Sequence, residues 1–191
     1  MSHFKDILIV TWHGIHDLNI YPGLPDTGGQ NIYVQNLAET IHDLYGCRVI
    51  ILNRGGYPHP YTKLQRTGIV KDPGRELYVY HIEDEVKAFL RKEYLTPALI
   101  EQASEVAIKT FPDDYSPDLI ISNFWDGGIM GECLRKLINP IIPHVWIPHE
   151  TVNIKQSLLT SKQLQQHSIP IRMYNEAKIM DDAECAGATS R

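Results

Sequence analysis

Two adjacent glycines stand where a loop leads into an amphipathic segment, in the stretch LPDTGGQNIYVQNLAETI at residues 24–41. Gly28 and Gly29 permit close approaches of the backbone that a side chain would forbid, and Asp26 and Thr27 are residue types that cap helices. Bare N–H groups at a helix start, helped by the helix dipole, attract an anion such as phosphate. On its own the glycine pair favours a tight turn before a capped helix, so the phosphate prediction depends on what lies near it.

Other polar residues follow predicted strands at comparable positions. In an open parallel sheet, ligands bind beyond the carboxyl ends of the strands, which lie at one edge. Each residue alone has an ordinary explanation, because a polar side chain at a strand end most often satisfies a local hydrogen bond. Their common placement predicts a functional site at that edge. The residues are His13, Gly14 and Gln30, then Asn123, Phe124, Trp125 and Asp126, then His149 and Glu150, with Lys155 shortly after.

Two further clusters have simple explanations. His13 and His16, with Asp17 nearby, have a spacing compatible with chelation from a loop, but no convincing third and fourth ligand lies near this pair in sequence. The chain also has neither zinc-type cysteine pairs nor HExxH, so no metal site is predicted. The basic stretch EVKAFLRKEYL at residues 85–95 contains Lys92, which could reach a phosphate or lie on a solvated helical face. The general tendency favours the solvated face.

Alternating strands and helices must position these residues. The alternation predicts the α/β class, with a Rossmann-like, doubly wound and mostly parallel sheet. Residues 55–74, rich in glycine, proline and positive charge, predict a surface excursion with at most short strands. The expected strands cover 6–12, 47–54, 75–82, 117–125, 143–150 and the start of another at 187–191; the expected helices run from the glycine loop to Tyr45, over 94–112, over 127–139 and over 162–186 with a break at Pro170.

The first of these helices has a rough apolar stripe. Ile32, Leu37 and Ile41 recur at helical spacing, together with Ala38 and Leu44. We expect this stripe to face the core and the polar residues between its members to face solvent.

The composition indicates a globular protein of one domain, since the chain has 191 residues and is 43% hydrophobic. A formal net charge of -5 argues against a general nucleic-acid surface. The N-terminus lacks a signal-peptide pattern, and no apolar run is long enough to cross a membrane. The widely spread Cys47, Cys133 and Cys185 fit reduced thiols better than disulfides. We therefore expect a cytoplasmic protein with no nucleic-acid or membrane partner.

The motifs carry a family resemblance along most of the chain. The D-T-G-G-Q element is followed in order by GRELYVYHI, KAFLRKEYL, SPDLIISNFWDGGIMG, PHVWIPHE and IPIRMYNEAKIMDDAECAGATSR. Together they resemble the N-terminal domain of sucrose-phosphate synthase and related retaining glycosyltransferases of family 4, which have the two-domain GT-B fold. The resemblance implies that residues 1–191 form a single N-terminal, acceptor-side domain. It also implies that the C-terminal domain, which binds the nucleotide sugar, is absent after Arg191.

The resemblance implies a role for each matching residue. His149 matches the family histidine beside the transferred sugar and would act in catalysis by orienting and stabilising through hydrogen bonds. The glycines would leave room for phosphate and sugar, and Gln30 would bond a sugar hydroxyl or phosphate. Glu150 follows His149 directly, where the family usually has a small residue. The residues implied in substrate binding are Gly28, Gly29, Gln30, Lys92, Trp125, Asp126, Lys155 and Arg172, of which Lys92, Lys155 and Arg172 would hold an acceptor phosphate.

The implied activity is transfer of a hexose from a nucleotide sugar, expected to be UDP-glucose, to a sugar or a sugar phosphate such as fructose 6-phosphate. No cofactor is expected in this domain itself, and without the other wall of the cleft the chain is expected to be inactive alone. One alternative is a stand-alone sugar-phosphate-binding or regulatory module without catalysis. Another is an unrelated α/β enzyme such as a nucleotide-dependent reductase, which is disfavoured because no G-x-G-x-x-G follows the first strand.

Overall fold

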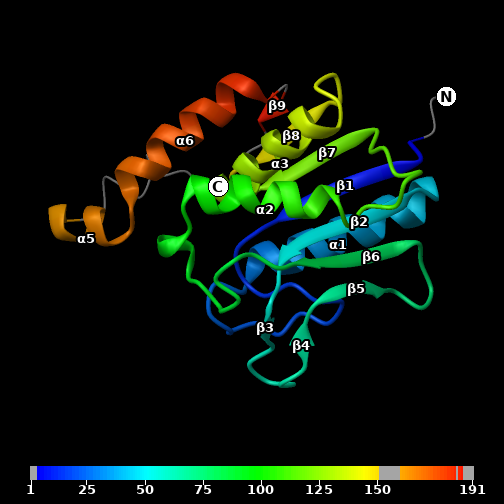
Figure 1. Cartoon of the computed structure of the whole chain (residues 1–191), viewed down its shortest axis with the longest axis horizontal. Helices are drawn as coiled ribbons and strands as arrows, with labels where there is room; N and C mark the ends of the chain where they lie inside the picture. The colour runs from blue at the N-terminus through cyan, green and yellow to red at the C-terminus, as the bar shows by residue number, and fades with distance from the viewer. Residues whose placement is uncertain (1–3, 151–159, 184, 187–191) are drawn as a thin grey trace.

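A seven-stranded sheet forms the centre of the molecule. The computed structural model describes residues 4–150, 160–183 and 185–186. The strands follow the order β5-β6-β2-β1-β7-β8-β9, and all neighbours pair in parallel except the edge strand β5, which is antiparallel to β6. The mostly parallel α/β sheet predicted from the sequence is thereby confirmed (Figure 1). Its strands are β1 (Asp6–Thr11), β2 (Arg48–Arg54), β5 (Gly68–Lys71), β6 (Leu77–Ile82), β7 (Leu119–Asn123), β8 (His144–Ile147) and β9 (Cys185–Ala186).

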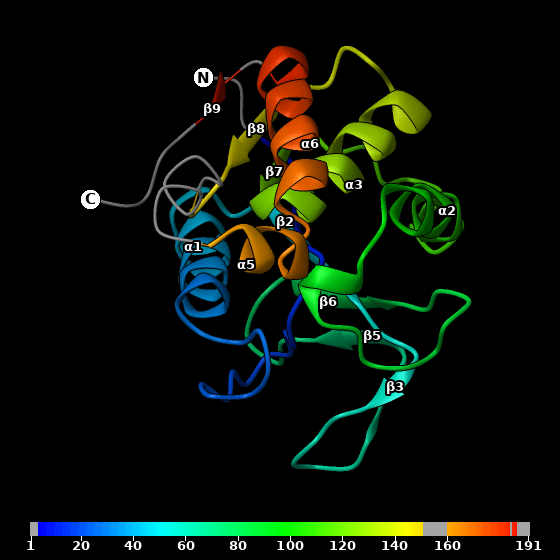
Figure 2. The same ribbon diagram turned by 90° about the vertical axis from the view of Figure 1, so that its left-hand side faces the viewer.

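Helices cover both faces of the sheet. Figure 2 shows α1 on one side of the strands, with α2 and α3 on the other. The helices are α1 (Gly29–Tyr45), α2 (Pro97–Ile108), α3 (Phe124–Ile138), α5 (Ser161–Gln166) and α6 (Ile169–Asp182), with a short 3₁₀ helix, η1 (Lys92–Tyr94), before α2. No helix among residues 4–150, 160–183 and 185–186 is long and apolar enough to cross a membrane.

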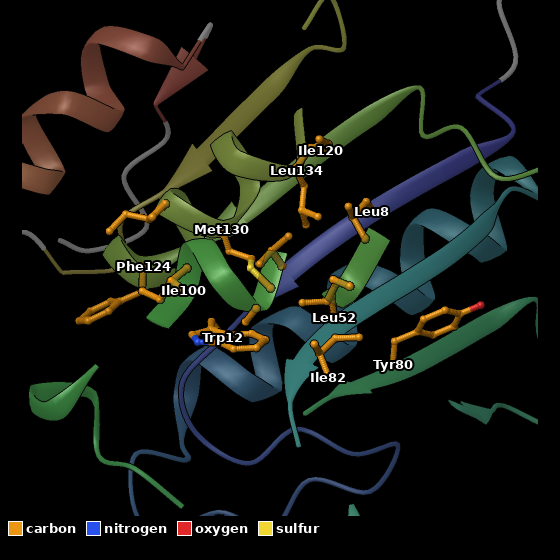
Figure 3. Close-up of a cluster of buried hydrophobic side chains, with 14 of the residues drawn as sticks. Leu8, Trp12, Leu52, Tyr80, Ile82, Ile100, Ile120, Phe124, Met130 and Leu134 are labelled. Carbon is orange, nitrogen blue, oxygen red and sulfur yellow. The ribbon is translucent and has the colours of Figure 1, made fainter. Parts of the chain in front are cut away.

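The side chains of β1 alternate between two hydrophobic cores, because successive residues of a strand point to opposite faces. Leu8 and Val10 belong to the larger core, which the apolar sides of α2 and α3 complete (Figure 3). Ile7 and Ile9 belong to a second core with Val34 of α1. This two-sided burial explains the continuous apolar sequence of the strand.

The strand order reverses at β1. This strand pairs with β2 on one side and with β7 on the other. Helix α1 connects β1 to β2, whereas α2 connects β6 to β7 across the middle of the sheet. Helices that leave β1 and β7 therefore cover opposite faces, and the carboxyl ends of these two strands border the position where such sheets bind ligands.

Helix α3 begins earlier than the sequence predicted. The strand predicted over 117–125 ends at Asn123, and the helix predicted from residue 127 starts at Phe124. Phe124, where the chain turns from β7 into α3, has a φ of 63°, in the left-handed region. An added Cβ at Gly127 would lie 3.1 Å from the carbonyl oxygen of Val10, so the first turn of α3 lies directly on β1.

The buried face of α1 differs from the predicted stripe. Ile32 is exposed and Leu44 is 69% exposed, whereas Gln35 is buried. Leu37 and Ile41 do pack partly against the core. Gln35 lies on the buried face and accepts a hydrogen bond, at 3.2 Å, from Nε2 of His16 in the loop after β1. A polar contact within the protein therefore replaces part of the expected apolar face.

The other differences lie at the chain's surface excursion and at its C-terminal end. Residues 55–74 form the β3 (Tyr57–Pro58) and β4 (Gln65–Arg66) hairpin and the edge strand β5, as short as predicted. The helix predicted over 162–186 divides before Pro170 as expected, but Cys185–Ala186 pairs with β8 as a strand. The prediction of helix there was wrong because pairing with the sheet outweighs local propensity. The strand predicted over 187–191 lies outside the described residues.

A glycine of α3 tests how closely this helix packs on the sheet. An added Cβ at Gly131 would lie 2.7 Å from Nε2 of His144. This buried ring is held by a hydrogen bond of 2.6 Å to Ser122, so it has little room to move away. We expect Gly131→Ala to lower the free energy of unfolding by about 1–3 kcal/mol in urea denaturation. Gly74→Ala, in a turn where the nearest atom is 3.5 Å from the added Cβ, is the control and should change it by less than about 0.5 kcal/mol. Equal effects of the two substitutions would contradict the tight fit.

Candidate functional site

The glycine loop opens α1 at the carboxyl edge of the sheet. Gly28 is the N-terminal cap, in extended backbone, and its N–H donates to Oδ1 of Asn31 at 3.1 Å. The expected caps were wrong: the Thr27 hydroxyl accepts from the N–H of Ile15, and Asp26 accepts from the N–H of Lys92. These residues instead fasten the loop to two other segments.

The space beside Gly28 and Gly29 is open. An added Cβ at either position would meet nothing within 4 Å, and neither residue has a positive φ. Packing and backbone angles within the described chain therefore do not require glycine here. Gln30, the next residue, donates from Nε2 to the hydroxyl of Thr11 at 3.0 Å and so lies against the end of β1. The arrangement leaves bare backbone open to a molecule that approaches the helix start.

A buried carboxylate in the first turn of α3 holds His13. Oδ2 of Asp126 accepts from the backbone N–H of His13 at 2.7 Å, and Oδ1 lies 2.8 Å from Nδ1 of the ring. Asp126 is 0% exposed, and its neighbour Trp125, which is 1% exposed, belongs to the larger hydrophobic core. The sequence-based assignment of Trp125 and Asp126 to an acceptor pocket stays a prediction, and Asp126 has a clear positioning role toward His13.

His149 lies just beyond the end of β8. Its Nε2 is 2.8 Å from Oδ1 of Asn123, and its ring meets the edge of Tyr33 at a centroid distance of 5.1 Å. Since the Asn123 amide nitrogen donates to the carbonyl of Val10, Oδ1 must be the acceptor, so Nε2 of His149 carries a proton. Burial, with a smaller effect from nearby His13, lowers the pKa of His149 to about 4. The ring is therefore neutral at physiological pH.

Two cations from distant segments meet at the ring of Phe124. Nζ of Lys92 is 5.5 Å from the ring centroid, and the guanidinium carbon of Arg172 is 4.9 Å from it. Phe124 lies at the margin of the larger core (Figure 3). Its ring meets the ring of His13 at a centroid distance of 4.7 Å. Of the three basic residues that the resemblance implied, the structure thus brings two together. Lys155 lies outside the described residues.

These two cations differ in how they are balanced. Lys92 is held by Asp26, whose carboxylate lies 3.5 Å from Nζ. Arg172 is 1% exposed, and burial lowers its pKa. Its Nε and one terminal nitrogen have no hydrogen-bond partner in the described part of the chain, although a Glu176 oxygen lies 3.8 Å from that terminal nitrogen. A buried guanidinium with unused donors suits a phosphate or carboxylate group.

Sequence reasoning missed the central place of Phe124 and the role of Asp26 as the partner of Lys92. A positive φ at a phenylalanine has no sequence signal, and a residue before a glycine pair looks like a cap. The suspected chelating group also separates: His13 contacts Asp126, His16 contacts Gln35, and Asp17 contacts His81. Within the described ranges, no group of three or more histidine, cysteine or acidic residues could hold a metal ion.

The chain is similar in sequence to curated glycosyltransferases. It is 29% identical over 152 residues to mannosylfructose-phosphate synthase of Agrobacterium fabrum, covering 78% of this chain and 30% of that protein. It is 31% identical over 162 residues to D-inositol 3-phosphate glycosyltransferase of Corynebacterium urealyticum, covering 85% of this chain and 35% of that protein. The chain therefore spans about a third of the length of these relatives. No family model matches it.

The fold has a close counterpart among solved structures. Sucrose-phosphate synthase from Thermosynechococcus elongatus superposes with a TM-score of 0.77 and 23% identity, over 95% of this chain and 41% of that one. The match confirms the Rossmann-like half of a GT-B fold, and the sequence relatives confirm the resemblance to glycosyltransferases of this kind.

The low pKa of His149 can be measured directly. We expect NMR titration of the imidazole to show a neutral ring at and above about pH 5.5, because its pKa is about 4 rather than the ordinary value near 6.5. Between about pH 4 and pH 6.5 His149 is protonated in the unfolded chain but neutral in the folded one. The contribution of His149 to stability is therefore complete above about pH 6.5 and is lost as the pH falls toward 4. The variant His149→Gln assigns the resonance, and a midpoint near 6.5 would contradict the buried setting.

Proposed function

We propose that the chain is the acceptor-side domain of a retaining glycosyltransferase that transfers a hexose from a nucleotide sugar, expected to be UDP-glucose, to a sugar phosphate such as fructose 6-phosphate. The observation that carries the proposal is the meeting of Lys92 and Arg172 at Phe124, beside the open start of α1. The names of the sequence relatives refer to phosphorylated sugars or inositol, which supports a phosphorylated acceptor.

In this proposal the acceptor phosphate binds between the two cations. Arg172 provides fixed, planar donors, and its burial strengthens a charge-assisted hydrogen bond because little water competes. Lys92 adds a second charge that Asp26 holds near the ring of Phe124. A dianionic phosphate would offset the energetic cost of keeping an unsatisfied guanidinium buried.

The transferred sugar would lie between His149 and the glycine loop. His149 is neutral, so it acts by orienting and polarising rather than by carrying charge. The backbone at Gly28 and Gly29 would approach the phosphates of the donor, with Gln30 bonding a hydroxyl or phosphate. Retaining transfer of the kind implied by the resemblance uses the leaving diphosphate oxygen to help deprotonate the attacking hydroxyl. The protein then contributes mainly by positioning and charge stabilisation.

The proposal includes a second domain that binds the nucleotide sugar. Because the chain spans about a third of its sequence relatives, we propose that this domain acts with it in cis or in trans. Donor positioning and exclusion of water both need the opposite wall of the cleft. No further cofactor is proposed for this domain.

Binding of the acceptor phosphate is testable on the chain by itself. We expect isothermal titration with fructose 6-phosphate to show binding that Lys92→Ala and Arg172→Met each weaken by about tenfold or more, since each removes one charged contact. Methionine replaces the aliphatic part of the buried arginine side chain and so limits the loss of packing. Lys178→Ala, on the exposed side of the same helix as Arg172, is the matched control and should change the affinity less than about twofold. Absence of binding, or equal effects of all three variants, would contradict the phosphate site.

Activity should depend on the second domain. We expect the chain alone to show negligible turnover with UDP-glucose and fructose 6-phosphate, and a separately expressed donor-binding domain to restore sucrose-phosphate formation. His149→Ala should lower the restored rate by about a hundredfold, because one positioned hydrogen-bond donor beside the reacting centre is lost. Rapid turnover by the chain alone would contradict the proposal. Acceptor binding without any restored activity would favour the regulatory-module alternative.

A further inference from the structure

A separate cavity of about 250 Å³ lies beside the carboxyl ends of β2 and β6. It forms between the loop that follows β1 and the β3–β4 hairpin, which projects from the body of the molecule (Figure 2). Neither Lys92 nor Arg172 lines it. Its lining includes Asp17, Asn19, Tyr21, Leu64, Gln65 and Val70.

Asp17 is a fixed hydrogen-bond acceptor in the wall of this cavity. Its Oδ1 lies 2.6 Å from Nε2 of His81 and 3.1 Å from Nε of Arg66. Burial by itself would raise its pKa, but these hydrogen bonds and charges lower the pKa of Asp17 to about 2. The side chain remains 23% exposed, so an ionised carboxylate with a set orientation faces the available space.

Arg66, the one guanidinium that the described residues bring to the lining, has no N–H donors left for a ligand. Nε of Arg66 donates to Asp17, and one terminal nitrogen donates to the carbonyl of Arg54 and the hydroxyl of Tyr57. The other terminal nitrogen donates to the carbonyl of His16 and to Asn53. All five N–H groups of an arginine are thereby used. Since the charges of Asp17 and Arg66 also cancel, this cavity is poorly suited to a phosphate or another anion.

Besides His59, His81 and Thr62, the rest of the lining combines apolar and amide groups. Tyr21 is 37% exposed, and Leu64 and Val70 are also exposed, although all three border the cavity. Asn19 and Gln65 provide amides that can both donate and accept. Ligand pockets usually begin at roughly 300 Å³, so a single small ring fits this space better than a nucleotide.

We propose that this cavity binds one neutral sugar ring. Hydroxyl groups donate to Asp17 and exchange hydrogen bonds with Asn19 and Gln65, while the C–H face of the ring packs on Tyr21 and Leu64. The ring belongs either to a free hexose or to the end of a longer glycan, which present the same chemistry. The inference does not rest on the proposed transfer activity, because no residue of the acceptor-phosphate site takes part.

The test is a two-dimensional NMR titration of the full chain with D-glucose, maltotriose and inorganic phosphate as separate probes. We expect D-glucose, with a Kd in the millimolar range, to shift the side-chain amide signals of Asn19 and Gln65. Maltotriose shifting the same signals at lower concentration would indicate a longer glycan, and equal potency a free hexose. Inorganic phosphate should leave both signals unchanged. No shift with either sugar up to about 100 mM, or a shift with phosphate, would overturn the proposal.

Variants of the cavity lining locate the bound sugar, and Lys92→Ala distinguishes its site from the acceptor-phosphate site. Tyr21→Ala and Gln65→Ala change surface side chains and should weaken D-glucose binding, by about tenfold for the loss of the aromatic wall. Tyr45→Ala, at the exposed end of α1, is the matched control and should leave the affinity unchanged. Lys92→Ala should also leave D-glucose binding unchanged while it weakens fructose 6-phosphate binding. Loss of both ligands in Lys92→Ala would place the sugar at the acceptor site and overturn the inference.

Discussion

The first turn of α3 lies directly on the end of β1, and the rest of the site depends on this contact. Glycine at position 127 favours this contact, because an added Cβ would lie 3.1 Å from the carbonyl oxygen of Val10, closer than most side chains come. The contact brings Asp126 beneath His13 and leaves the ring of Phe124 at the margin of the core. Asn123, at the same junction, donates to Val10 and accepts from His149, so the histidine beyond β8 is oriented through β7. One close approach thus sets the positions of groups from three strands.

The electrostatic character of the edge follows from burial. A histidine ring that is half-buried stays neutral because the charged form is poorly solvated there, and a neighbouring histidine adds to this effect. Arg172 cannot avoid the cost of burying its charge by losing its proton, because a guanidinium stays charged in proteins. Its charge is instead shared with the face of Phe124 and with the more distant Glu176. The edge therefore combines a neutral hydrogen-bond donor with a buried guanidinium that has unused donors, although the carboxylates of Glu176, Asp126, Glu150 and Glu93 also act on that guanidinium.

The long loop after β1 connects the cavity beside Asp17 with the candidate acceptor-phosphate site at Lys92. Asp17, near its beginning, is tied to Arg66 and His81, and Asp26, near its end, is tied to Lys92. Gly14, at the start of the loop, has a φ of 75° and lies so close to the carbonyl oxygen of Asp26 that an added Cβ would be 2.3 Å away. A loop anchored at both ends by ion pairs loses less conformational freedom when a ligand binds.

Local sequence pattern was sufficient for the class of the sheet and for all its longer strands, and it predicted a candidate site at their carboxyl edge, but it missed the strand at Cys185–Ala186. Strands such as ILIV in β1 are buried on both faces and are therefore apolar throughout, and the alternation with helices identifies a parallel sheet whose strand ends coincide. The glycine pair and the motifs that follow it were likewise sufficient for the family resemblance. None of these signals depends on contacts between distant residues.

Tertiary structure decided the pairing of the charged groups. Lys92 and Asp26 are 66 residues apart, and Arg172 reaches Phe124 from another helix, so no local spacing could connect them. The positive φ of Phe124 and the polar contact of Gln35 with His16 also arise only when helices and loops pack together. Periodicity reports which way a side chain points along its own element. Where two such side chains meet is set by the packing of whole elements, and that packing turned a glycine loop and scattered basic residues into one candidate site.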